Sequence, residues 1–70
     1  MMSKITLKAA RVNANISQKN AAQMLGVAPS TLRSWESGKT YPKQNQINAI
    51  LLLYGVKFDN IFFGTKSTLS

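Results

Sequence analysis

Gly26 is the residue that most restricts how this chain can fold, because it separates two short helical patterns by a single turn. In the pattern before it, 17–25, Ser17 offers a hydroxyl that can cap a helix start, and the apolar residues recur every three to four positions. Glycine adopts the left-handed backbone conformation at a helix end without steric cost. A helix is therefore predicted to stop at Gly26.

A second helix is predicted directly after that turn. Val27 should turn inward, Pro29 suits a first helical turn, and Leu32 and Trp35 repeat the apolar spacing up to Ser37-Gly38. Ala28 stands at the cap position, where alanine offers no side-chain acceptor. Two helices of about two turns, joined this tightly, must cross at a steep angle. The stretch 17–37 is thus predicted to form a helix-turn-helix.

Three further helices are expected around this corner. The first starts near Ile5, capped by Thr6 or Ser3, and ends at 13–15. The longest follows Pro42 and ends at Gly55, and a short fifth helix is predicted over 56–62. The prediction is a compact all-α, five-helix fold. It forms one domain over 1–70, with an ordered core at 5–63, a loose start at 1–4 where Met2 covers part of the core, and a tail at 64–70.

Charge points to the kind of partner. Nine Lys and Arg against two acids give a net charge of +7 on 70 residues. Such an excess repels itself in the folded state, so a polyanion is the natural partner, and nucleic acid is favoured over a merely solubilising surface. A membrane surface is disfavoured because no segment combines a basic face with a long amphipathic helix.

Several function classes are disfavoured by what the composition lacks. The chain has no Cys and no His, so disulfides, thiolate sites and the commonest metal ligand and general base are absent, and neither metal nor cofactor is expected. The serines have no histidine base, which makes an enzyme the least favoured interpretation. The longest apolar run, Ala49 to Tyr54, is far short of the ~20 residues of a membrane span. A soluble, cytoplasmic protein is expected.

An ordered set of residues over nearly the whole chain resembles the lambda-repressor-like helix-turn-helix family, which includes phage Cro proteins and XRE-type regulators. The residues that carry the likeness are Arg11, Ile16-Ser17-Gln18, Leu25-Gly26-Val27, Leu32, Trp35-Glu36, Gly38-Lys39 and Pro42. The resemblance implies a domain that binds double-stranded operator DNA, usually as a two-fold dimer on a pseudo-palindromic site. It also implies a bacterial cell, with phage or prophage origin as one option.

The same resemblance implies roles for individual residues. The helix starting at Pro29 would lie in the major groove, with its side chains at base edges or phosphates. Arg33 has two open roles, guanine or phosphate, with phosphate favoured. The implied base contacts are Pro29, Ser30, Ser34 and Arg33, and the implied backbone contacts are Gln18, Lys19, Thr31, Lys39 and Lys43.

Arg11 and Glu36 match residues that the family often pairs in a partly buried ion pair beside the DNA surface. An acid within a DNA-facing helix is unfavourable unless something neutralises it, so this pair is expected to be structural. Trp35 is expected to pack half-buried rather than to stack on bases.

Two functions remain open from the sequence. The favoured one is a sequence-specific transcriptional regulator of Cro or small-repressor type, and the other is a modulator or antitoxin that binds a repressor or toxin. The longest helix carries more apolar residues than its inward stripe needs, which indicates either the edge of the core or an association surface. The candidate dimer surface comprises Leu52, Leu53, Phe62 and Phe63.

Overall fold

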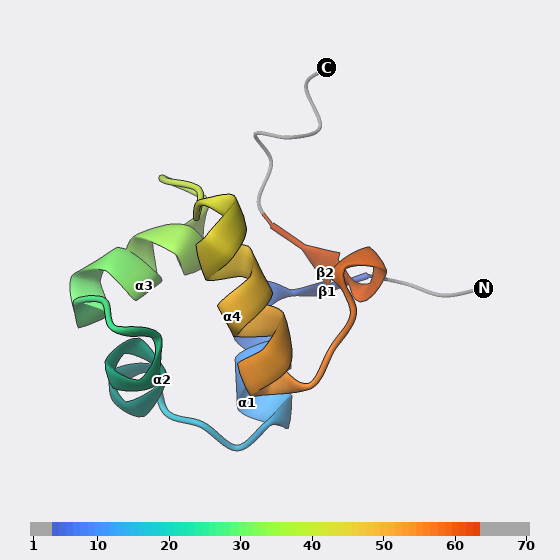
Figure 1. Ribbon diagram of the computed structural model, residues 1–70, viewed down its shortest axis with the longest axis horizontal. Coiled ribbons are helices and arrows are strands. Elements are labelled where there is room, and N and C mark those ends of the chain that lie inside the picture. Colours follow the sequence, from blue (N-terminus) through green and yellow to red (C-terminus); the bar gives the residue numbers. More distant parts are fainter. Residues whose placement is uncertain (1–3, 64–70) are drawn as a thin grey trace.

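The computed structural model describes residues 4–63 and shows helices wrapped around one core (Figure 1). The predictions for Met2, for the loose start up to residue 3 and for the tail at 64–70 lie outside the described residues. The order is β1 (Ile5–Thr6), α1 (Leu7–Asn13), α2 (Gln18–Leu25), α3 (Pro29–Ser37), α4 (Gln44–Tyr54), the 3-10 turn η1 (Phe58–Asn60) and β2 (Ile61–Phe62).

The helix boundaries follow local capping. Thr6 Oγ1 accepts from the Ala9 amide at 3.0 Å, and Ser17 Oγ accepts from the Asn20 amide at 3.1 Å. Gly26 has φ +73°, in the left-handed region predicted for it, and the Val27 amide then donates to the Ala22 carbonyl at 3.0 Å. The left-handed Gly26 and the bond from Val27 close the corner between α2 and α3 within three residues.

The core is formed by all four α-helices of the described residues together with β2. α1 crosses behind α4, while α2 and α3 pack on the other side (Figure 1). Trp35, predicted to be half-buried, is only 5% exposed. The buried apolar residues are Leu7, Ala10, Ala21, Ala22, Leu32, Trp35, Ile47, Ile50, Tyr54, Ile61 and Phe63.

The all-α class is confirmed, but the predicted fifth helix is wrong. Residues 58–60 form a single 3-10 turn, and Ile61–Phe62 then runs extended and pairs in parallel with Ile5–Thr6, with Ile5 opposite Ile61. Ile5 consequently belongs to β1 and not to the first helix. Pairing between the two ends of the fold satisfies backbone groups that a short isolated helix would leave unpaired.

Candidate nucleic-acid interface

α3 presents a polar face at the protein surface. Its buried positions, Leu32 and Trp35, anchor the opposite face in the core. Pro29 occupies the first helical position after Ala28, which makes no side-chain cap bond, as its residue type predicts. Of the predicted contact residues on this helix, Pro29, Ser30 and Arg33 are exposed, and Thr31 and Ser34 are half-buried.

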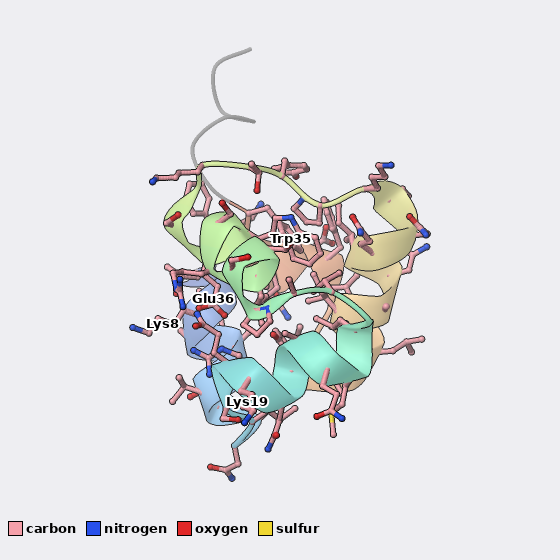
Figure 2. The ribbon with its side chains drawn as sticks, turned by 90° about the vertical axis from the view of Figure 1, so that its left-hand side faces the viewer. Lys8, Lys19, Trp35 and Glu36 are labelled. Atoms are coloured by element: carbon pink, nitrogen blue, oxygen red, sulfur yellow. The ribbon has the colours of Figure 1, made fainter. Side chains whose placement is uncertain are left out.

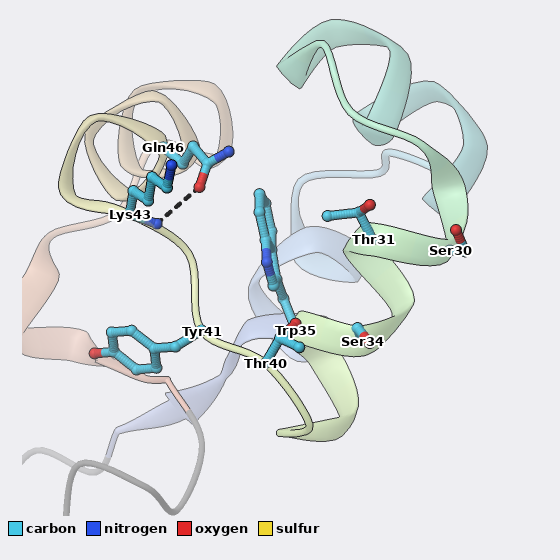
Figure 3. Close-up of a pocket in the computed structure, with 8 residues that line it drawn as sticks. All are labelled: Ser30, Thr31, Ser34, Trp35, Thr40, Tyr41, Lys43 and Gln46. Atoms are coloured by element: carbon cyan, nitrogen blue, oxygen red, sulfur yellow. Dashed lines mark hydrogen bonds between the residues drawn. The ribbon is translucent and has the colours of Figure 1, made fainter.

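A groove runs between α3 and the start of α4. The indole of Trp35 lies between its two walls, with hydroxyl side chains on the α3 side and the start of α4 opposite (Figure 3). The groove has a volume of about 480 Å³. Its lining residues are Ser30, Thr31, Ser34, Trp35, Thr40, Tyr41, Lys43 and Gln46.

Three lining residues, Thr40, Tyr41 and Gln46, were missed by sequence reasoning. Gln46 stands three residues after Lys43, the N-cap of α4, and its Oε1 accepts from the Lys43 amide at 2.7 Å. A glutamine at this spacing from a helix start is half of a capping box, so the pattern could have placed Gln46 here. Thr40 and Tyr41 had no comparable signal, because loop conformation positions them.

The Arg11–Glu36 ion pair is present and links α1 to α3. Arg11 Nε lies 2.7 Å from Glu36 Oε2, and the two side chains are only 8% and 5% exposed. Arg11 Nη2 donates to Glu36 Oε1 at 3.4 Å, and Nη1 donates to the Ile16 carbonyl at 2.8 Å. Figure 2 shows Glu36 on the side of α3 that faces α1. The negative charge of α3 is thus neutralised inside the protein.

Gln18 joins this network from α2. Its Nε2 donates to Glu36 Oε1 at 3.0 Å, so one carboxylate holds side chains from both α1 and α2. Gln18 therefore has a structural role that its implied phosphate contact did not anticipate, and that phosphate contact stays a prediction. The network therefore ties α3 to both α1 and α2.

The predicted cationic contacts all lie on the surface. Lys19 on α2 lies on the face shown in Figure 2, and Lys8 on α1, for which no contact was predicted, projects at the left edge of that face. Lys39 and Lys43 lie on the connection between α3 and α4. Among the described residues the second acid is Asp59 in η1, on the side of the molecule away from α3 (Figure 1). The α3 face therefore carries cations without an unpaired carboxylate.

The candidate dimer surface is only partly available. Leu52 is 85% exposed, while Leu53 and Phe62 are half-buried. The prediction for Phe63 is wrong: it is 5% exposed and packs between Phe58, with ring centroids 5.7 Å apart, and Tyr41, at 5.9 Å. In extended backbone alternate residues share a face, so Phe63 points into the core with Ile61.

Tyr54 is a buried titratable side chain whose hydroxyl is influenced by the charges of Arg11 and Glu36. Burial raises the pKa of its hydroxyl from 10 to about 12, and the nearby Glu36 carboxylate adds to the rise while Arg11 opposes it.

The described residues contain no group of three His, Cys, Asp or Glu that could hold a metal ion. No helix within residues 4–63 is long and apolar enough to cross a membrane.

Residues 7–61 match the sequence profile of the helix-turn-helix family. The chain belongs to the XRE-type helix-turn-helix family. This match covers both helices of the corner, the ion pair between α1 and α3, and the groove between α3 and α4. It confirms the lambda-repressor-like resemblance drawn from the sequence.

Two curated proteins are similar to this helix-turn-helix chain. The HTH-type transcriptional activator BcrR of Enterococcus faecalis is 31% identical over 60 residues, which are 86% of this chain and 29% of BcrR. The type II methyltransferase M1.ScrFI of Lactococcus lactis subsp. cremoris is 40% identical over 50 residues, which are 67% of this chain and 13% of that enzyme. The chain thus spans less than a third of either relative. No solved structure gives a significant match.

Proposed function

We propose that this protein binds double-stranded DNA and regulates transcription, with α3 as its recognition helix. The observation that carries this proposal is the surface of α3: exposed polar side chains beside exposed cations, with its one acid held by Arg11. A helix of this kind fits the major groove, where side chains reach base edges. The similarity to the activator BcrR supports a regulatory role.

The residues of the interface divide by chemistry. Ser30 and Ser34 offer hydroxyls that donate to or accept from bases, and Pro29 offers apolar contact to a thymine methyl group. Arg33 is long enough to bind a phosphate at the edge of the DNA major groove. The remaining contacts hold the backbone and fix the register on the duplex. They come from Gln18, Lys19, Thr31, Lys39 and Lys43.

In its finer form the proposal is a small repressor of Cro type acting on a pseudo-palindromic operator. A two-fold site needs a two-fold protein, and the exposed Leu52 with the half-buried Leu53 and Phe62 provides apolar surface for a homodimer. Such a protein would act in the cytoplasm of a bacterial cell and carry no cofactor and no catalytic group. Phage or prophage origin is part of this finer proposal.

Selection of bound sequences from random duplex DNA tests the proposal directly. We expect a consensus with half-site symmetry, and a fall of log affinity with log salt of slope about −0.9 per neutralised phosphate. Ser34→Ala should change the consensus at one or two positions, whereas Lys39→Ala should weaken all sequences about equally. Failure to enrich any sequence, together with salt-independent binding, would contradict the proposal.

A second candidate is supported by the apolar surface. Leu52, Met24 and Phe58 are 85%, 64% and 48% exposed, and exposed apolar side chains of this size can dock another protein, such as a repressor or toxin. In that case Leu52→Lys would abolish binding to the protein partner, while Lys39→Ala would leave it unchanged. Loss of DNA binding on Lys39→Ala favours the regulator instead.

A further inference from the structure

Gln46 holds its side-chain amide in one orientation at the wall of the groove. Its Oε1 accepts from the Lys43 backbone N–H at 2.7 Å. Because an amide has its acceptor and its donors on opposite branches, this bond turns Nε2 and its two hydrogens the other way. Figure 3 shows Nε2 directed away from Lys43, towards the space above Trp35. The groove therefore contains a pre-oriented hydrogen-bond donor.

The neighbouring glutamine of α4 is arranged differently. Gln44 Nε2 donates to Asn48 Oδ1 at 3.1 Å along the outside of the helix, and Gln44 does not line the groove. Gln46 Nε2 has no such partner among the described residues. The two glutamines thus share a residue type and a helix end, but only Gln46 offers its donor to the groove.

The lining of the groove suits an anionic ligand rich in hydrogen-bond acceptors. Lys43 supplies positive charge on the same wall as Gln46, and Ser30, Thr31, Ser34 and Thr40 supply hydroxyls. None of its lining residues is acidic. A phosphodiester matches this set, since its non-bridging oxygens accept hydrogen bonds and carry the negative charge. If α3 lies in the major groove of the DNA, the sugar-phosphate backbone of one DNA strand would run along the protein groove between α3 and α4.

We propose that the groove between α3 and α4 seats a phosphodiester of one DNA strand, and that Gln46 Nε2 donates to one of its non-bridging oxygens. This inference rests on the proposed DNA binding and adds a residue that the sequence did not indicate. The contact positions the protein without reading sequence. Lys43 supplies the charge, and Gln46 supplies a directed donor.

The test uses Gln46→Glu with Gln44→Glu as its matched control. Glutamate at 46 keeps an acceptor for the Lys43 amide, so the thermal midpoint should match that of the wild type. It replaces the donor with a negative oxygen, and we expect binding to a labelled random-sequence 20-base-pair duplex to weaken about 10- to 100-fold in 0.15 M salt. Gln44→Glu adds the same charge outside the groove and should weaken binding by less than about threefold.

Four outcomes separate the possibilities. The losses described above, also seen with DNA of selected sequence, support the phosphate contact. Equal losses in the two variants overturn it, because charge alone then explains the effect. A loss confined to selected DNA and absent with the random duplex overturns the phosphate assignment in favour of base reading. Wild-type protein that fails to bind either duplex overturns the proposed function and this inference together.

Discussion

Removing either partner of the Arg11–Glu36 pair should destabilise the fold far more than removing both. Glu36→Gln leaves the positive charge of the Arg11 guanidinium, 8% exposed, without a carboxylate, because the Ile16 carbonyl and the new amide oxygen are neutral acceptors. Arg11→Met leaves the Glu36 carboxylate, 5% exposed, with only the Gln18 amide. Leaving one charge of a buried pair uncompensated costs about 3–5 kcal/mol.

That cost is large for this protein. A folded chain of 70 residues has a free energy of unfolding of roughly 4–10 kcal/mol, so each single variant should be largely or partly unfolded at 37 °C. In the double variant Arg11→Met/Glu36→Gln no charge is left buried. Its loss should therefore be smaller than either single loss by about 2 kcal/mol or more.

Urea unfolding followed by Trp35 fluorescence measures this cycle. Trp35 is the only tryptophan and precedes Glu36, so its emission reports the packing of α3. Asp59→Asn is the control: it removes the other acid, which is exposed in η1, and should change the free energy of unfolding by less than about 0.5 kcal/mol. Single losses below about 1 kcal/mol, or losses that simply add, would refute the reasoning.

Three more predictions follow from burial and capping. The pKa of Tyr54 is raised to about 12, so the folded state holds the proton of this hydroxyl more tightly than the unfolded state does. The free energy of unfolding should therefore fall as the pH rises from 10 to 12. Tyr54→Phe should abolish that part of the pH dependence of urea unfolding. Phe63→Ala should cost about 3–5 kcal/mol by thermal or urea unfolding and Leu52→Ala less than about 0.5, and a reversed order would contradict the assignment of Phe63 to the core. Ala28→Ser should raise the stability measured in the same way by about 1 kcal/mol, and Ser17→Ala should lower it by a similar amount; no gain at position 28 would mean that the α3 start does not accept a cap.

The corner of α2 and α3 was predictable because its causes are local. Ser17 caps its own helix, Gly26 supplies the left-handed residue, and Pro29 opens the next helix. Each of these effects acts within a few residues, so the sequence carries them without knowledge of the fold. The ion pair of Arg11 and Glu36 is long-range, and it was expected only through the family resemblance.

The C-terminal segment was mispredicted because its cause is remote. Val56, Phe58, Ile61 and Phe62 can be fitted to a helical spacing, but Ile61 gains a partner in Ile5 at the other end of the fold. That pairing makes the chain extended and changes the period of burial from about four residues to two. For this reason Phe63, predicted to lie at the surface, is buried in the core. There its ring packs against the ring of the groove residue Tyr41.

The pairing of β1 with β2 also has a consequence for the order of assembly. Closing it brings together segments separated by almost the entire described chain, which costs more chain entropy than forming the corner between adjacent helices. The two-residue ribbon should therefore form last on folding and open first under native conditions. Hydrogen exchange should show the amides that bridge β1 and β2 losing protection while those within α2 and α3 keep theirs.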